Sequence, residues 1–258
     1  MLVEGMGNHL DLAIVTLYIF WIFFAGLIFY LRREDRREGY PLVAEPPRRG
    51  RPLGPEIFPL MPEPKTFELE SGETVLAPAA SEKDTREVNM HRSDPWPGSP
   101  WEPSGDPMVD GVGPASWAMR SDVPDMTHDG LPKIVPLRAI EDHTVDEHDY
   151  DPRGMNVVGL DKEVAGKVTE IWADRAEMII RYLEVDANGR TVLVPMTLCR
   201  VHGSRDEVEV DSVKAEHFGK APLIAGPDQV TLLEEDKIVA FFAGGHLYAS
   251  PDRMGPIL

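Results

Sequence analysis

LAIVTLYIFWIFFAGLIFYL, residues 12–31, is a run of twenty residues without a charge or a proline. As an α-helix rising about 1.5 Å per residue it is about 30 Å long, which matches the hydrocarbon core of a bilayer. A buried helix of a globular protein would show a polar face over this length, and none is visible. A cleaved signal peptide would start with basic residues and carry a shorter apolar core. The stretch therefore predicts a single transmembrane helix.

The charges on either side of this helix predict its orientation. Residues 1–11 contain no lysine or arginine, whereas arginines follow the helix immediately. Cationic residues collect on the cytoplasmic side of a membrane, so residues 1–11 are expected outside and residues 32–258 in the cytoplasm. The side chains expected at the lipid headgroups on that side are Arg32, Arg33, Arg36, Arg37 and Tyr40.

The composition excludes several classes of function. The net charge of −18 argues against a nucleic-acid partner, because no basic surface could neutralise phosphates. The single cysteine, Cys199, cannot form an internal disulfide, which agrees with a reducing compartment. The sequence has no CxxC, HExxH, P-loop or GxGxxG motif. The familiar enzyme motifs are therefore missing.

The segment 32–120 is rich in proline. Fifteen of the 24 prolines lie within residues 46–124, a density that forbids long helices and central strands. Its aromatic residues, among them Trp117, are more frequent than in a disordered tether. We therefore expect an extended segment lying on partner subunits. One small hairpin is expected where FEL (67–69) and TVL (74–76) flank a Ser-Gly turn.

From about residue 155 the composition is that of a β-rich domain. β-branched and aromatic residues dominate short segments separated by turns, one of which is the Asn188-Gly189 pair typical of two-residue hairpins. The expected strands are VAGKVTEIWAD (164–174), RYLEVD (181–186), TVLVPMTLCRV (191–201) and DEVEVD (206–211). Short strands at this spacing predict a small antiparallel barrel or closed sheet.

A helix is expected after these strands. Thr231 and Glu234 form a capping box, and the following run ends at Gly244-Gly245, a typical C-terminal stop. The acids of its first turn suit the helix dipole. The predicted fold is thus a single N-terminal transmembrane helix and a mainly-β cytoplasmic domain, residues 121–258, with a C-terminal helix.

EDHTVDEHDYD (141–151) contains six acids and two histidines. His143, Asp146, Glu147 and His148 could be arranged as metal ligands, which leaves open a metal-dependent enzyme that uses His143 and His148. No helix or hairpin fixes their geometry, however, so a solvated acidic loop is favoured.

Seven motifs spread over the chain resemble one protein family. They are AGLIFYL (25–31), REGYPL (37–42), PKTF (64–67), GDPMVDGVGPASW (105–117), AGKVTEIWAD (165–174), LLEEDKI (232–238) and AGGHLYASP (243–251). On these motifs the chain is similar to the H subunit of the photosynthetic reaction centre of purple bacteria. The resemblance implies a single-pass anchor in the bacterial inner (intracytoplasmic) membrane, a periplasmic N-terminus and a cytoplasmic PRC-barrel domain.

The resemblance also implies a function. An H subunit is not an enzyme and binds no pigment itself. It stabilises the L and M subunits, caps their quinone sites and conducts protons from the cytoplasm to the secondary quinone. L and M are then expected to hold bacteriochlorophyll, bacteriopheophytin, quinones, a carotenoid and non-haem iron. A cytochrome subunit, a light-harvesting antenna and membrane lipids are further partners that it allows. The alternative is a membrane-tethered PRC-barrel adaptor for another complex.

The residues implied in proton transfer lie first in ADRAEMIIR (173–181). Carboxylates suit this task when neighbours or burial raise their pKa towards ambient pH. By position in the family, Glu177 lies closest to the quinone pocket and Asp174 nearer the surface. If the piece forms a helical turn, Arg181 lies near the same face and can hold one acid ionised. From the residues alone, a solvated acid pair with an ordinary salt bridge is the alternative.

Proton uptake from the cytoplasm is expected in SDVPDMTHDGLPK (121–133). The candidate residues there are Asp125, His128 and Asp129. An unperturbed histidine titrates near pH 6.5, so His128 can collect protons at neutral pH. Family members can carry a second histidine where this chain has Leu131, so a histidine pair, and zinc binding by it, is not supported here.

Overall fold

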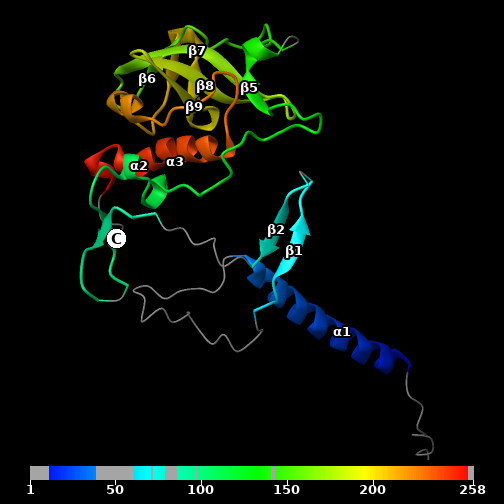
Figure 1. The fold of residues 1–258 in the computed structure, drawn as a ribbon. Helices are drawn as coiled ribbons and strands as arrows, with labels where there is room; N and C mark the ends of the chain where they lie inside the picture. Colours follow the sequence, from blue (N-terminus) through cyan, green and yellow to red (C-terminus); the bar gives the residue numbers. More distant parts are fainter. Residues whose placement is uncertain are drawn as a thin grey trace, which may run out of the picture. The chain divides into compact units, whose positions relative to one another are not determined.

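The computed structural model describes residues 12–38, 61–70, 72–78, 86–96, 98–140 and 143–254. The predicted periplasmic residues 1–11 and the headgroup residue Tyr40 lie outside the described residues. The chain forms two units, residues 1–85 with 95–98 and residues 86–94 with 99–258. The first contains the apolar helix and a hairpin, and the second contains the β-rich domain (Figure 1).

Helix α1 (Leu12–Glu34) is the predicted apolar helix, and the 3₁₀ turn η1 (Asp35–Arg37) follows it. Within the described ranges it is the one helix long and apolar enough to cross a membrane. It continues beyond the predicted end at Leu31 because the arginines and the glutamate that follow are good helix formers. The Thr16 hydroxyl donates to a carbonyl of its own helix at 2.7 Å, so this polar group is satisfied within the span.

The first unit also contains the predicted hairpin. Strands β1 (Lys65–Glu68) and β2 (Thr74–Ala77) pair antiparallel, with Phe67 opposite Val75. Gly72, between the strands, has a φ of +80°, a left-handed conformation that glycine adopts without steric cost. The predicted hairpin is therefore confirmed.

The second unit is built around a seven-stranded sheet. Its strands are β5 (Ile134–Pro136), β6 (Asn156–Val158), β7 (Val164–Asp174), β8 (Ile179–Ala187), β9 (Arg190–Pro195), β10 (Arg200–His202) and β11 (Glu207–Glu209). The order across the sheet is β10-β11-β6-β7-β8-β9, and β5 pairs with β7. The pairing is antiparallel except between β11 and β6, which are parallel.

The predicted antiparallel barrel needs two corrections. The sheet is mixed, because β6 and β11 are parallel, and its described strands do not close into a ring. The predicted strand 191–201 is also interrupted: Pro195 ends β9, and a 3₁₀ turn precedes β10. Proline cannot donate a backbone hydrogen bond to a neighbouring strand, which accounts for the break. A mainly-β domain with a C-terminal helix is confirmed.

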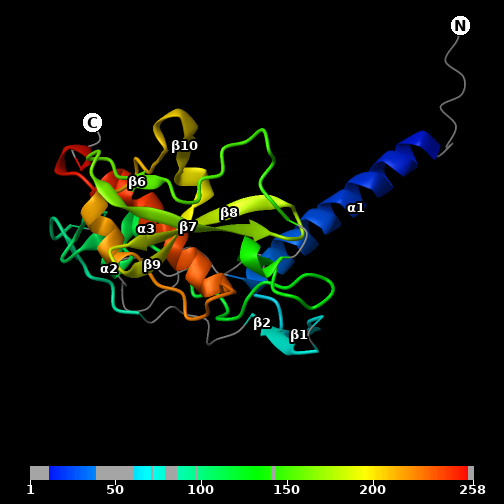
Figure 2. The ribbon, with the colours of Figure 1, turned by 90° about the horizontal axis from the view of Figure 1, so that it is seen from above.

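Helix α3 (Leu232–Tyr248) lies along one face of the sheet (Figure 1 and Figure 2). The predicted capping box is present: the Thr231 hydroxyl accepts from the Glu234 N–H at 3.1 Å, and the Glu234 carboxylate accepts from the Thr231 N–H at 2.9 Å. The largest fully buried side chains of the core include Ile171, Trp172, Leu183, Phe218, Phe241 and Phe242. Burial of this apolar surface between helix and sheet is the main stabilising term of the domain.

The predicted end of this helix at Gly244-Gly245 is wrong. The helix continues to Tyr248, and both glycines are sites of close packing. A Cβ on Gly244 would lie 2.5 Å from the side chain of Ala115, and one on Gly245 would lie 2.5 Å from the Ser212 carbonyl oxygen. The two glycines therefore serve close approach rather than helix termination.

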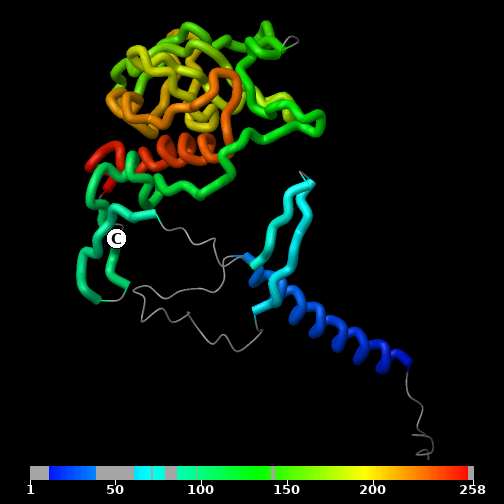
Figure 3. The backbone as a smooth tube through the Cα atoms, viewed as in Figure 1, coloured from blue at the N-terminus to red at the C-terminus, as the bar shows by residue number. Residues whose placement is uncertain are grey.

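Shorter elements complete the second unit. Strands β3 (Met90–Arg92) and β4 (Trp101–Pro103) form a separate antiparallel pair, and helix α2 (Pro107–Asp110) follows them. The 3₁₀ turns are η2 (Gly113–Ala115), η3 (Leu137–Ala139), η4 (Met196–Leu198), η5 (Gly203–Arg205), η6 (Ala215–Lys220) and η7 (Pro251–Arg253). The loop 121–133, green in Figure 3, leaves the body of the domain and returns to β5.

Candidate functional site

The predicted acids lie at the turn between β7 and β8. Asp174 is the last residue of β7, Glu177 is in the turn, and Arg181 lies on β8. The Asp174 carboxylate accepts from the backbone N–H groups of Ala176 and Glu177 at 2.9 and 3.0 Å, a side-chain to backbone turn that aspartate favours. Strand pairing and this turn form a hairpin here, so the helical turn that would place Arg181 near the same face as the two acids is not formed.

This correction changes the role of Arg181. In a hairpin, residues of β8 alternate between faces, so the spacing of three and four residues no longer brings the three side chains together. No ion pair joins Arg181 to Asp174 or Glu177, all of which are described. The cation that pairs with these two acids is a different residue.

Lys133 is that cation. Its Nζ lies 3.4 Å from a Glu177 carboxylate oxygen, 3.5 Å from one of Asp174 and 3.7 Å from one of Asp125. The pairing of β5 with β7 places Lys133 there, since Ile134 lies opposite Asp174 and the Lys133 carbonyl accepts from the Arg175 N–H at 3.0 Å. We call Asp125, Lys133, Asp174 and Glu177 the lysine cluster.

The members of the lysine cluster differ in burial. The Asp174 side chain is 1% exposed, whereas those of Glu177 and Asp125 are 55% and 48% exposed. Burial opposes the charge of Lys133, but the carboxylates of Asp174, Glu177 and Asp125 outweigh it and raise the pKa of Lys133. Within this chain, Asp174 is thus the buried acid of the cluster and Glu177 an exposed one.

The loop 121–133 brings the predicted uptake residues to the lysine cluster. A pocket of about 550 Å³ is lined by Asp125, His128, Asp129 and Lys133, among others. His128 Nε2 lies 3.1 Å from a carboxylate oxygen of Asp129, and the two side chains are 91% and 66% exposed. Asp125, His128 and Asp129 therefore share one open pocket with the cluster lysine.

A second pocket, of about 260 Å³, adjoins the other side of the cluster. Asp125, Lys133 and Asp174 line it together with Arg181, Tyr182 and Glu235. Arg181 therefore belongs to the site through this pocket and not through a salt bridge with Glu177. Tyr182 and Glu235 were not predicted. Glu235 lies in the first turn of α3, where an acid suits the helix dipole and carries no other signal in the sequence.

The metal-ligand hypothesis for 141–151 is not supported by the geometry. His143 Nε2 lies 2.8 Å from the sulfur of Met178, while His148 Nδ1 lies 2.9 Å from an Asp146 carboxylate oxygen on the exposed loop. The two histidines therefore have different neighbours. In the part of the chain that the structure describes, which lacks Glu141 and Asp142, no three His, Cys, Asp or Glu side chains gather as a metal site.

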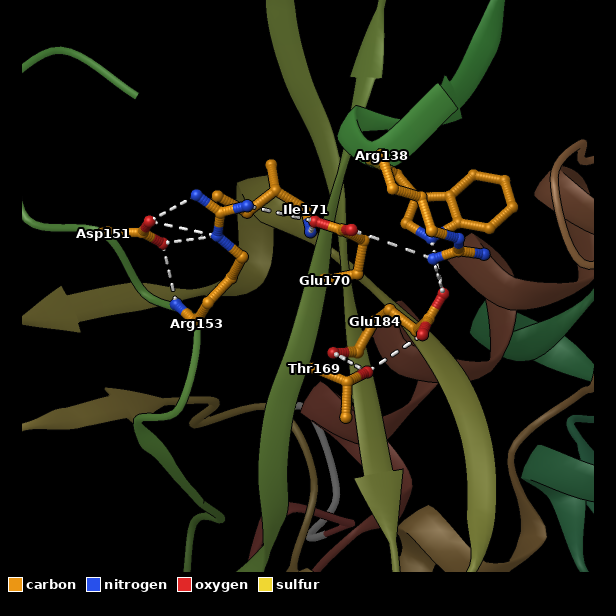
Figure 4. Close-up of polar contacts among 8 residues, drawn as sticks. Arg138, Asp151, Arg153, Thr169, Glu170, Ile171 and Glu184 are labelled. Carbon is orange, nitrogen blue, oxygen red and sulfur yellow. Dashed lines mark hydrogen bonds and ion pairs between the residues drawn. The ribbon is translucent and has the colours of Figure 1, made fainter. Parts of the chain in front are cut away.

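A separate group of acids lies on the same two strands but outside both pockets of the site (Figure 4). Glu170 on β7 lies 3.9 Å from Arg138 and 3.6 Å from Arg153. Glu184 on β8 accepts from the Trp172 indole N–H at 2.9 Å and lies 3.4 Å from Arg138. Each of these two acids has an arginine partner, so this group stabilises the packing of η3 against the sheet.

Among the arginines predicted at the lipid headgroups, Arg37 binds several other groups of the first unit. Arg37 donates to both carboxylate oxygens of Glu34, and its Nη1 donates to the carbonyls of Glu63 at 2.8 Å and Ala77 at 3.0 Å. Arg37 thus connects the end of α1 to the open end of the β1–β2 hairpin, where β1 begins and β2 ends. Arg32 and Arg33 lie in the last turn of α1, and Arg36 lies in η1.

Two protein families match the chain. The family described as photosynthetic reaction centre, H-chain N-terminal region, matches residues 4–139, which is more than half of the chain. The PRC-barrel domain family matches residues 145–217, which contain β6 to β11. Together the two matches cover the apolar helix, the loop 121–133 and the β7–β8 hairpin. The chain therefore belongs to the reaction-centre H-chain family, whose members are non-pigment-binding accessory subunits of the reaction centre.

Proposed function

We propose that this H subunit conducts protons from the cytoplasm to the secondary quinone through the lysine cluster. The observation that carries the proposal is the lysine cluster itself. Three carboxylates lie within 3.7 Å of Lys133, and Asp125 and Lys133 line both pockets. The same subunit stabilises the L and M subunits and covers their quinone sites. Its N-terminus is periplasmic, its domain is cytoplasmic, and it resides in the inner membrane.

The chemistry of quinone reduction explains the need for such a cluster. Reduction of a quinone to a quinol takes up two protons, and a quinone pocket that excludes water cannot draw them directly from the medium. Acids that interact strongly titrate as a group, which widens the pH range over which one of them can accept or release a proton. Lys133 provides a positive charge within 3.7 Å of all three acids and holds them together as one group.

The direction of transfer follows from exposure. His128 and Asp129 lie at the open pocket and collect protons from the cytoplasm, and Asp125 passes them to the cluster. Asp174 is buried in the chain, whereas Glu177 lies exposed at the hairpin turn. An exposed Glu177 can serve as the last acid before the quinone only if L and M cover the turn. The exposed tip is therefore assigned to the interface with those subunits.

The substitution Glu177→Gln in the assembled complex tests this proposal. Glutamine keeps the size of the side chain and cannot pass on a proton, so transfer of the second, proton-coupled electron to the secondary quinone should slow. A single acid–base group contributes about 10²-fold or more when it has no parallel route. The first electron needs no full protonation and should be transferred at nearly the wild-type rate.

Glu207→Gln is the matched control, because Glu207 lies on β11 and its carboxylate pairs with Arg205 at 3.6 Å, outside both pockets. Flash kinetics would measure both electrons. An E177Q complex that transfers the second electron at the wild-type rate from about pH 6 to about pH 9 would remove Glu177 from the route.

The adaptor alternative is disfavoured by the family match. A PRC-barrel adaptor for another complex would need only the barrel, whereas the H-chain match covers residues 4–139 as well. The alternative of an enzyme with metal ligands at His143 and His148 is disfavoured by their separate neighbours.

A further inference from the structure

Tyr182 and Glu235 form a hydrogen-bonded pair across two elements of the domain. Tyr182 lies on β8 with 3% of its surface exposed, and Glu235 lies in the first turn of α3. The Tyr182 hydroxyl donates to Glu235 Oε2 at 2.8 Å. The sequence does not suggest this contact, because 53 positions separate the two residues and only the packing of α3 on the sheet brings them together.

The pair lies in the wall of the 260 Å³ pocket that it shares with the lysine cluster. The other charged groups that line this pocket are Arg120, Asp125, Lys133, Asp174, Arg181 and Asp236. A water molecule occupies about 30 Å³ in the liquid, so the pocket has room for several. Polar groups line it from the loop, β7, β8 and α3, so each water can find the two or more hydrogen-bond partners that it needs.

The surroundings of Glu235 favour proton binding. Burial raises the pKa of Glu235, and the charge of Asp125 adds to this. The hydrogen bond from Tyr182 and the charges of Arg181 and Arg120 lower the pKa but do not cancel the effect of burial. Burial also raises the pKa of Tyr182 far above its usual value, so its hydroxyl remains a donor at any physiological pH.

We propose that Glu235 is a second proton-carrying residue of this subunit, positioned by Tyr182, and that it exchanges protons with the lysine cluster through water in their shared pocket. This inference rests on the proposed proton-conducting function. In one step the O–H bond of the Glu235 carboxyl breaks and its proton passes to a pocket water. That water releases one of its own protons to the carboxylate of Asp174 or Asp125. No electrons move, and the reverse step restores the proton on Glu235.

A purely structural role is the competing interpretation, since the same hydrogen bond holds α3 on β8. The two interpretations differ in what a substitution does to the pH dependence. A contact that only holds the helix changes stability and leaves the pH profile of proton-coupled electron transfer unchanged. If Glu235 carries protons, a substitution that changes its pKa also shifts the pH profile of proton-coupled electron transfer.

The substitution Glu235→Gln in the assembled complex provides the first test. Glutamine can still accept the Tyr182 hydrogen bond but carries no proton. Because Glu177 remains as a parallel route, the second electron should slow by about 10-fold rather than by the full 10²-fold of a sole acid. Light-induced infrared difference spectra should lose one carboxylic acid band in the same variant.

The substitution Tyr182→Phe provides the second test and keeps the buried ring in place. It removes the hydrogen bond that lowers the pKa of Glu235, so Glu235 should hold its proton to higher pH. The high-pH limb of the second-electron rate should therefore move to higher pH while the maximal rate is retained. Glu184→Gln is the matched control for Glu235→Gln. Glu184, on β8, is likewise a glutamate that accepts a side-chain hydrogen bond, but it does not line this pocket.

The outcomes separate this inference from the proposed function. If E177Q slows the second electron, while E235Q and Y182F change neither its rate nor its pH profile, the Glu235 inference is wrong and the cluster proposal stands. If E235Q slows the second electron and E177Q does not, Glu235 carries protons and Glu177 is not part of the route. If E235Q fails to assemble, an unchanged pH profile and unchanged infrared bands in Y182F overturn the inference by themselves.

Discussion

Lys133 is the residue on which the candidate site depends. Its ammonium group has three donors, and three carboxylates from the loop, from β7 and from the hairpin turn lie within 3.7 Å of it. Without it, Asp174 would be a buried carboxylate with two backbone N–H donors and, among the described residues, no cation partner. One lysine therefore makes a buried acid compatible with the fold and connects it to two exposed acids.

The substitution Lys133→Gln should affect both stability and proton transfer. Removal of one partner of a buried charge typically costs about 1–3 kcal/mol in the free energy of unfolding. The three carboxylates also lose the positive charge that they share, so the pH profile of second-electron transfer should change. Thermal unfolding and the pH profile of the second electron would measure the two effects.

The control for this prediction is Lys167→Gln, an exposed lysine on the same strand, β7, as Asp174. A difference between the K133Q and wild-type pH profiles of second-electron transfer is the decisive result. The elevated pKa of Lys133 means that its stabilising charge is fully present below its ordinary value of 10.5 and is lost only as the pH rises through the elevated value. A K133Q profile identical to wild type would contradict the role of Lys133 in the site.

At the scale of elements, the sequence predicts features that depend on adjacent residues. It does not predict contacts that depend on the pairing register of distant strands. The helix at 12–31, the hairpin near Ser71-Gly72 and the capping box at Thr231 each follow from adjacent residues, and the structure contains all three. The partner of Asp174 depends on how β5 pairs with β7, a contact between segments about 40 positions apart. The spacing of these residues would bring Arg181 to the acids only in a helical turn, and the chain forms a hairpin there.

The residues of the second pocket could not be predicted from the sequence for a related reason. Acids at the start of a helix are favourable for its dipole wherever they occur, so Glu235 carries no distinguishing signal. Only the packing of α3 against β8 shows that Glu235 is half-buried and bonded to Tyr182. Likewise, Gly244-Gly245 matches a helix stop in sequence, while the contact with Ala115 shows why the helix continues.

Arg37 makes a prediction at the same scale, because it connects two elements of the first unit. Its guanidinium donates to the carbonyls of Glu63, just before β1, and Ala77, the last residue of β2, at the open end of the hairpin. A two-stranded hairpin is at best marginally stable alone in water. Arg37→Gln in the full chain should therefore make the amides of residues 65–77 exchange several-fold faster, as measured by hydrogen exchange.

Arg32→Gln is the matched control for this loss of charge, because Arg32 lies exposed in the last turn of α1. It should leave exchange in the hairpin unchanged. Equal exchange rates in R37Q and in the unmodified chain would show that Arg37 does not support the hairpin.

At the scale of the whole molecule, the sequence indicates what the chain is built for. An uncharged helix with arginines on one side only is typical of a membrane anchor that carries a polar domain. The family matches agree with that description over residues 4–139 and 145–217. The lysine cluster and its two pockets are the part of this domain to which we assign the proposed proton route, since anchoring alone would not require them.

Proton uptake in inside-out membrane vesicles tests this account most directly, since it reports both the side and the route of the protons. A membrane-impermeant pH dye outside such vesicles faces the cytoplasmic surface. We predict uptake from the dye side after the second flash in the unmodified complex and in E207Q. In the double variant Asp174→Asn, Glu177→Gln the same uptake should be delayed by about 10-fold or more. Uptake as fast as in the unmodified complex, or from the opposite side of the membrane, would contradict the account.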